Sequence, residues 1–342
     1  MSKVFFAPPD AIEGALPRLL EAAGFLALLT HRRRLGIKLH FGEDGNHNHL
    51  KPAYVRSAVE TVACRVTDCV LIETTTLYRG SRARAASHVA LAHRHGFTLA
   101  NVMAPIQILD GEHGEDFYEV PVNLRHVARA RLGRRLKFIP QLLNMAHFKG
   151  HFVTGFGGVL KNLAMGLAAK GGKLEMHSLS KPVVDEEKCL SCGDCVEYCP
   201  HQAIDFIREV ARIGRSCTGC ASCIAVCRSG AISIKWNEAA EILGMKIVEY
   251  AYAVLQHRIA LHLNFVLRVT PNCDCMGTTE EPLMPDVGVF ASLDPVACEQ
   301  AAWDRVQPAL GRVYPHLAPE QQIAYAEQLG LGSRQYEVIQ VG

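Results

Sequence analysis

The chain has 342 residues, of which 49% are hydrophobic, and it carries a formal net charge of +2 at pH 7. This length suits about two domains with a large core, and the near-neutral charge excludes a general nucleic-acid-binding protein. No uncharged apolar run reaches the roughly 18 residues of a membrane-spanning helix, and the start lacks a secretory signal, so we expect a cytoplasmic protein that does not contact membranes.

Strands alternate with helices in the N-terminal third. Apolar runs predict strands at 35–41, 69–72 and 100–104. Helices are predicted at 52–66, where a proline lies in the first turn, and at 81–95. Strands that alternate with helices favour an open, mostly parallel α/β sheet.

The next segment, 117–122, alternates polar and apolar residues and predicts an edge strand. Six basic residues without an intervening acid follow it: Arg125, Arg129, Arg131, Arg134, Arg135 and Lys137. They are interpreted either as a solvated face or as a docking patch for an acidic redox partner.

A glycine-rich segment with two histidines comes next. His147 and His151 lie four apart, so a helix would place both imidazoles on one face, but Gly150 favours a loop. A metal site and ordinary loop residues therefore both remain open. The turn at 155–158 precedes a predicted helix and is either an anion site on free N–H groups or a tight helix–strand junction. Three lysines nearby could neutralise an acidic substrate: Lys149, Lys161 and Lys173.

Eight cysteines between 189 and 227 form two runs of C-x-x-C-x-x-C-x-x-x-C, and the second run repeats the first at an offset of 28 residues. This spacing is typical of bacterial proteins with two [4Fe–4S] clusters, in which the fourth cysteine of each run serves the other cluster. Zinc sites use two cysteine pairs with a longer gap, and disulfides need an oxidising compartment. The sequence therefore predicts two [4Fe–4S] clusters.

Crossed fourth ligands divide the eight cysteines into two sets. The first cluster is assigned Cys189, Cys192, Cys195 and Cys227. The second is assigned Cys217, Cys220, Cys223 and Cys199. Pro200 follows the first run, whereas Arg228 stands at the corresponding position of the second, which leaves the ligands in place.

The C-terminal part returns to alternating elements. Helices are predicted at 241–255, at 294–306 with an Asp-Pro start, and at 321–329. Strands are predicted at 259–266 and 287–291. We expect residues 1–181 and 237–342 to form one α/β domain, into which an α+β ferredoxin-like module at 182–236 is inserted.

Polar residues follow several predicted strands at the point where each ends, and ligands of open α/β sheets bind there. The candidate catalytic residues of such a site are His40, Glu43, His147, Lys149 and His151. The loop Cys273-Asp274-Cys275 presents two thiolates to one metal or forms a redox pair. The α/β domain thus has a candidate site for a further metal or an anion.

The chain resembles, from end to end, a family catalogued as domain of unknown function 362, in its form with a bacterial-type ferredoxin module. The stretches that carry the resemblance are 37–43, 76–82, 147–151, 155–158 with 161–163, 271–275 and 329–333. The resemblance implies two [4Fe–4S] clusters but no settled reaction. The segment 134–144 departs from the acidic, apolar strand expected before His147, because it is basic and contains Pro140.

Three functions remain open. The preferred one is a cytoplasmic iron–sulfur oxidoreductase that transfers electrons through its clusters to or from a site in the α/β domain. The second is an electron carrier that docks on a partner enzyme, and the third is a factor for iron–sulfur or cofactor maturation. Each implies a redox partner protein, and the substrate is not specified.

Overall fold

The computed structural model describes residues 1–31, 33–178, 181–235 and 237–341. Its centre is one eight-stranded sheet, in which β15 is antiparallel to both its neighbours and the other neighbouring strands are parallel. The strands, in spatial order, are β16 (Tyr336–Gln340), β1 (Ser2–Ala7), β15 (Gly288–Ser292), β14 (Ile259–Val266), β7 (Gln141–His147), β2 (Arg34–Lys38), β3 (Asp68–Glu73) and β4 (Ile106–Ile108). The predicted open, mostly parallel α/β sheet is confirmed.

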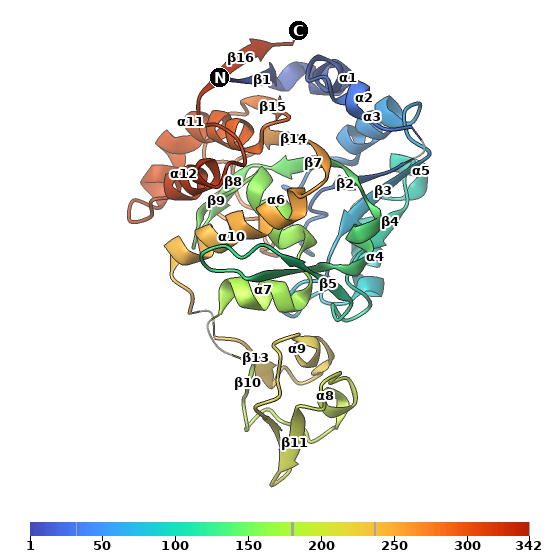
Figure 1. The fold of residues 1–342 in the computed structure, drawn as a ribbon, viewed down its shortest axis with the longest axis vertical. Coiled ribbons are helices and arrows are strands. Elements are labelled where there is room, and N and C mark those ends of the chain that lie inside the picture. The colour runs from blue at the N-terminus through green and yellow to red at the C-terminus, as the bar shows by residue number, and fades with distance from the viewer. Residues whose placement is uncertain (32, 179–180, 236, 342) are drawn as a thin grey trace.

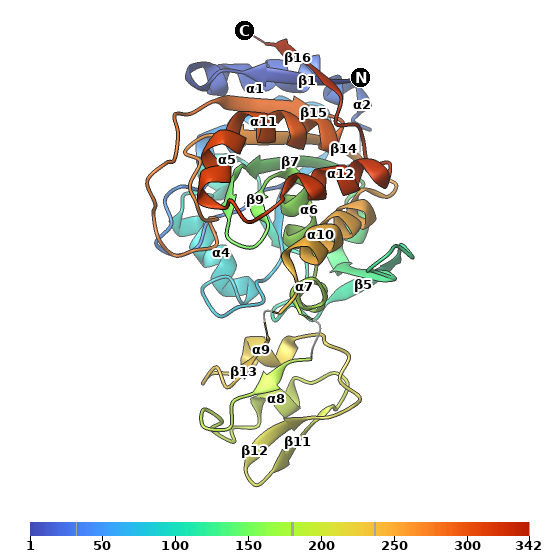
Figure 2. The same cartoon turned by 90° about the vertical axis from the view of Figure 1, so that its left-hand side faces the viewer.

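Helices cover both faces of the sheet, which makes three layers (Figures 1 and 2). One face packs against α1 (Ile12–Ala22), α2 (Phe25–Leu28), α3 (Pro52–Val62), α4 (Ala85–Arg94) and α5 (Leu99–Val102). The other packs against α6 (Val159–Leu167), α7 (Lys170–His177), α10 (Ala240–Leu255), α11 (Pro295–Val313) and α12 (Glu320–Gln328). All seven residues of β7 are buried, as expected for a parallel strand covered on both sides.

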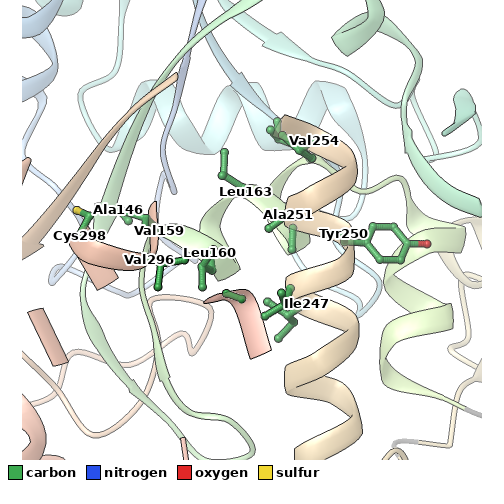
Figure 3. Packing of buried hydrophobic residues seen from close by; sticks show 14 of the residues in the cluster. Ala146, Val159, Leu160, Leu163, Ile247, Tyr250, Ala251, Val254, Val296 and Cys298 are labelled. Atoms are coloured by element: carbon green, nitrogen blue, oxygen red, sulfur yellow. The ribbon is translucent and has the colours of Figure 1, made fainter. Parts of the chain in front are cut away.

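The second face has a close-packed apolar core. Figure 3 shows Leu160 and Leu163 of α6 against Ile247 and Ala251 of α10, with Val296 of α11 beside them. These side chains recur at intervals of three to four residues, so one stripe of each helix is buried. This packing fixes the position of α6 over the carboxyl ends of β2 and β7.

Most predicted elements are confirmed with small shifts of their ends. The strand expected at 100–104 is wrong, because Thr98 caps the short helix α5 and the strand β4 begins only after Pro105. The segment at 117–122 is a strand, β5 (Phe117–Pro121), but it pairs with β6 (Arg129–Gly133) in a separate hairpin. Pro140 lies just before β7, since the 3₁₀ helix at Arg134–Phe138 replaces the first part of the expected strand.

Three residues of the basic segment 125–137 form ion pairs. Arg129 and Arg131 pair with Glu119 across the β5–β6 hairpin, and Arg134 pairs with Asp116. Five of the six basic residues are exposed and only Arg131 is half-buried, which agrees with a solvated face, while the docking patch stays a prediction.

Residues of the cysteine-rich segment lie outside the large sheet, below α7 in Figures 1 and 2. They form two half-repeats with α8 (Asp194–Glu197) and α9 (Ser222–Val226) in equivalent positions. Short strands complete them: β10 (Val183–Val184) with β13 (Ile232–Ser233), and β11 (Ile204–Ile207) with β12 (Val210–Ile213). The expected boundaries at 181/182 and 236/237 stay a prediction, and Trp236 lies outside the described residues.

Candidate functional site

A cavity of about 590 Å³ lies where the central parallel strands end. Lys38 and His40 reach it from the end of β2, and Glu73 from the end of β3. Lys149 and His151, on the short strand β8 (Lys149–His151) that follows β7, line another wall. The predicted clustering of polar residues at strand ends therefore brings three of the five candidate residues into one cavity.

Local hydrogen bonds fix the tautomers of His40 and His151. Nδ1 of His40 accepts the N–H of Gly42 at 3.0 Å, and Nδ1 of His151 accepts the N–H of Thr154 at 3.1 Å. Burial, followed by the charge of Arg82 for His40 and of Lys161 for His151, holds both pKa values well below the ordinary value. Each neutral ring therefore carries its proton on Nε2 and offers a donor rather than a metal-binding lone pair.

Glu43 lies behind the cavity wall rather than in it. Its carboxylate accepts from Nε of Arg82 at 3.1 Å and from the hydroxyl of Tyr78 at 3.2 Å. Arg82 and Tyr78 both line the cavity. Glu43 thus positions an arginine and a tyrosine, and the structure gives it no direct contact with the cavity.

His147 is also outside the cavity lining. Its Nδ1 lies 2.9 Å from the carboxylate of Asp274, and its Nε2 lies 2.7 Å from the carbonyl of Leu267. Both nitrogens are engaged with oxygen atoms of the chain, so neither is free to bind a metal. His147 lies on a strand, and its role is to anchor the loop that contains Asp274.

The loop at 270–276 packs tightly on β8. The N–H of Gly150 donates to Thr270 O at 2.8 Å, and a Cβ on Gly150 would lie 2.1 Å from Pro271 O. Asp274 is 1% exposed and pairs with Lys149 at 3.1 Å. Glycine is therefore required at 150 for the loop to reach the cavity.

A disulfide joins Cys273 and Cys275, and both residues line the cavity. Of the two arrangements expected for this C-x-C loop, the structure has the two sulfurs bonded to each other, and the roles of both cysteines stay a prediction. Among the described residues, no group of three or more His, Cys, Asp or Glu side chains is arranged around a single metal ion.

The helix start after the turn at 155–158 is capped from within the chain, which agrees with the tight-junction alternative. The N–H groups of Val159 and Leu160, at the start of α6, donate to the carboxylate of Glu299 at 2.8 and 3.2 Å. Glu299 is fully buried on α11 and also accepts from Asn264 at 2.9 Å. The chain's own carboxylate thus takes the helix N-terminus that a ligand was expected to use.

The lysines of the cavity differ in their partners. Lys38 forms a buried ion pair with Glu73 at 3.1 Å, and Lys173 donates to Ala168 O at 2.7 Å. Lys161 has no hydrogen-bond or ion-pair partner among residues whose placement is described. Burial, and then the charge of Lys149, lowers the pKa of Lys161 to about 7. Lys161 is therefore the cation of this cavity whose partner is missing.

The cysteine runs have matching backbone conformations. Ser191 and Gly193 have positive φ in the first run, and the equivalent residues Gly219 and Ala221 have positive φ in the second. Such left-handed residues turn the backbone so that a short loop can wrap around a bound group. The repeat seen in the sequence is thus a repeat of conformation.

Thiols of each set lie near one another, and backbone donors face two of the sulfurs. Cys199, Cys217, Cys220 and Cys223 line one small cavity. Burial raises the pKa of Cys195, and the neighbouring thiols of Cys192 and Cys227 add to this. The N–H of Ala203 points at Sγ of Cys199 at 3.3 Å, and the N–H of Ala211 points at Sγ of Cys189 at 3.5 Å. Thiolate donors with N–H groups aimed at sulfur fit an iron–sulfur cluster.

The cysteine-rich segment touches the cavity wall. Leu77 lines the cavity and also packs in the apolar cluster that contains Cys195 and Cys223. Nη1 of Arg131 donates to Thr218 O at 2.8 Å, and Nη2 of Arg79 donates to Arg228 O at 2.6 Å. Leu77 is therefore shared between the cavity lining and the apolar cluster that holds two of the cysteines.

Sequence reasoning missed several residues that shape the site. The buried charges concerned are Lys38, Glu73, Arg82, Asp274 and Glu299. A charge inside an apolar strand, as at Lys38, is the one signal that could have indicated them.

No helix within the described ranges combines the length and the apolar character needed to cross a membrane.

Comparisons with known proteins found relatives for a short part of the chain and a family for most of it. A ferredoxin from Pyrobaculum islandicum is 39% identical over 67 residues, which are 19% of this chain and 62% of the ferredoxin. The pyruvate synthase subunit PorD from Methanothermobacter marburgensis is 34% identical over 55 residues, 16% of this chain and 65% of that subunit. The chain thus spans less than two thirds of these relatives. Their likeness supports a ferredoxin-like module within this chain.

Among solved structures, the lactate racemase apoprotein from Thermoanaerobacterium thermosaccharolyticum is similar with a TM-score of 0.45 and 12% identity, over 90% of this chain and 58% of the racemase chain. The family model described as "Domain of unknown function (DUF362)" matches residues 35–304, which is most of the chain and includes both the cavity and the cysteine runs. The protein therefore belongs to the DUF362 family, in a form that carries a ferredoxin-like module.

Proposed function

We propose that the protein is an iron–sulfur oxidoreductase, which transfers electrons between two [4Fe–4S] clusters and a small molecule bound in the cavity. The observation that carries this proposal is the position of Leu77, which lines the cavity and belongs to the apolar cluster built mainly from the cysteine-rich segment. The clusters supply one-electron transfer when bound. The chain supplies the ligands, the separating leucine and the cavity.

We assign the ligands in the crossed manner that the spacing predicts. The first set is Cys189, Cys192, Cys195 and Cys227, and the second set is Cys217, Cys220, Cys223 and Cys199. The shared small cavity of the second set and the matching left-handed residues of the two runs support this assignment. Clusters of this kind are labile to oxidation, so the reducing cytoplasm is the proposed compartment.

The two ends of the cysteine-rich segment suit different partners. A Cβ on Gly171 of α7 would lie 3.0 Å from Gly219 O, so the second set lies next to the α/β domain. The loop of the first set lies against the β11–β12 hairpin, at the far end in Figure 2, where Leu190 and Ile207 are 67% and 57% exposed. A redox partner protein would dock at this exposed apolar end and exchange electrons with the first set.

The disulfide offers a second redox group in the cavity. Reduction of the bond between Cys273 and Cys275 consumes two electrons and two protons and yields two thiols. A pair of one-electron clusters can supply those two electrons. Cys273 and Cys275 would then convert single-electron transfer into two-electron chemistry on the bound molecule.

Anaerobic purification tests the proposal. We expect about eight irons and eight acid-labile sulfides per chain, the content of two [4Fe–4S] clusters. Cys220→Ser should lose about half of this iron, whereas Cys64→Ser, at an exposed cysteine outside the runs, should lose none. Wild-type protein reduced by a low-potential donor should convert Cys273 and Cys275 to alkylatable thiols, and Cys220→Ser should do so much more slowly. Equal alkylation in both proteins would contradict electron transfer into the cavity.

An electron carrier without its own substrate is the second candidate. The exposed apolar residues around the first set favour it, since a carrier needs only a docking surface. Substitution of Leu190 and Ile207 by Ser would then abolish all electron transfer to a partner enzyme, while changes in the cavity would have no effect. Under the preferred proposal, changes in the cavity stop the reaction and leave the cluster absorbance intact.

A further inference from the structure

The cavity contains a cation without a counter-charge. Three other cations of its wall are paired with carboxylates: Lys38 with Glu73, Arg82 with Glu43, and Lys149 with Asp274. Lys173, also in the wall, donates instead to the hydroxyl of Thr74 and the carbonyl of Ala168. No carboxylate within the described chain pairs with Lys161. An unpaired ammonium in a buried site costs several kcal/mol unless a ligand supplies the missing charge.

Two neutral donors supplement this cation. Nδ1 of His40 and Nδ1 of His151 accept backbone N–H groups, which leaves the proton of each ring on Nε2. No described residue accepts a hydrogen bond from either Nε2. His151 and Lys161 are close enough that the ammonium lowers the pKa of the imidazole. The cavity therefore presents an ammonium and two N–H donors that require an acceptor.

Much of the remaining wall is apolar, and the space is large. Six apolar side chains line it: Leu77, Phe152, Val153, Met165, Leu243 and Met276. A volume of about 590 Å³ equals roughly twenty water molecules at about 30 Å³ each. An inorganic anion or a two-carbon acid would leave most of this apolar surface uncovered, and a purely apolar ligand would leave the three donors unpaired.

We infer that the cavity binds an organic anion, a carboxylate or phosphate on an apolar body of about twenty non-hydrogen atoms, with Lys161, His40 and His151 as the donors to the anionic group. This inference rests on the proposed function only in calling that molecule the substrate, because binding requires no electron transfer. Carboxylate and phosphate share the chemistry that these donors recognise.

Binding of the anion is coupled to protonation of Lys161. Four titratable groups interact electrostatically with Lys161: Lys149, Asp274, His151 and His177. The pKa of Lys161 in the empty cavity is lowered to about 7, mainly by burial. Below pH 7 the ammonium is already present, whereas above pH 7 the cavity must take up a proton when the anion binds. Affinity for the anion should therefore fall as the pH rises above 7.

The test uses three probes with one apolar body: 1-naphthoate, 1-naphthyl phosphate and the neutral 1-naphthamide. Anaerobic calorimetry on the cluster-containing protein at pH 6.5 should show that at least one anion binds about tenfold or more tightly than the amide. Preference for naphthoate identifies a carboxylate ligand, and preference for naphthyl phosphate identifies a phosphate ligand. Equal affinity for all three probes would overturn the inference.

Lys161→Gln should weaken the preferred anion about tenfold and leave the amide unchanged, with Lys137→Gln as the matched control at an exposed lysine. If Lys161→Gln does not fold, titration of the wild type with naphthoate at pH 8 in two buffers of different ionisation enthalpy decides the matter. Uptake of close to one proton supports the inference, and uptake of none refutes it. Absence of electron transfer with this binding intact would refute the proposed function alone.

Discussion

The substitution Asp274→Asn removes the negative charge that holds the cavity loop in place. The carboxylate is 1% exposed and lies 2.9 Å from Nδ1 of His147 and 3.1 Å from Nζ of Lys149. In the variant, the ammonium of Lys149 and the ring of His147 face a neutral amide. Breaking one side of a buried ion pair costs about 3–5 kcal/mol. A chain of this size loses roughly 2–4 °C of Tm per kcal/mol, so we expect Tm to fall by roughly 6–20 °C.

Anaerobic thermal unfolding, followed by circular dichroism, measures this loss. The matched control is Asp44→Asn, because Asp44 pairs with Arg94 at 3.2 Å with both side chains more than half exposed. An exposed pair contributes about 0–1 kcal/mol, so the control should change Tm by no more than a few degrees. Equal Tm values for the two variants would refute the assignment of a buried charge cluster at Asp274.

The pH dependence of this pair has a definite sign. The pKa of Asp274 is held well below 3.8, by the charges of His147 and Lys149 against the opposing effect of burial. A carboxyl with a lowered pKa stabilises the fold above its ordinary pKa, and this stabilisation is lost only as the pH falls through the lowered value. The wild-type contribution of Asp274 should therefore persist from pH 8 down to pH 5. A loss of it already at pH 6 would contradict the pairing.

Three other substitutions test separate parts of the site by the same thermal assay. Gly150→Ala places a Cβ 2.1 Å from Pro271 O and should cost about 2–3 kcal/mol, whereas Gly14→Ala, with no atom within 4 Å of its Cβ, should be neutral or stabilising; equal effects would refute the close approach. Glu299→Ala leaves buried N–H groups at the start of α6 without an acceptor and should lower the free energy of unfolding by about 3 kcal/mol. A loss below about 1 kcal/mol would refute the cap. Lys161→Met should raise stability by about 2 kcal/mol at pH 6, because an unpaired buried charge is removed, and the gain should shrink as the pH rises from 7, the lowered pKa, towards 10.5; an equal gain at pH 6 and pH 9 would refute the unpaired ammonium.

Local patterns in the sequence predicted the sheet and part of the site. Strand β14 occupies the predicted range 259–266 without a shift, and Asp294 caps α11 as expected, accepting from two N–H groups of the first turn. The rule that ligands gather at strand ends selected His40 and His151, which lie more than 100 residues apart and line one cavity. The same rule also selected His147, because neighbouring residues of one segment are not distinguished until their directions are known.

The cluster-binding spacing and the α/β class were determined by the sequence itself. Cysteines two or three residues apart are brought together by the turn of a short loop, and strand or helix periodicity is equally local. Only the tertiary structure decided which charges meet: Glu299 caps a helix 140 residues earlier in the chain, and Asp274 pairs with His147 from 127 residues away. Such contacts depend on which strand ends become neighbours in the folded sheet. The same arrangement decides which lysines meet a carboxylate and which, such as Lys161, do not.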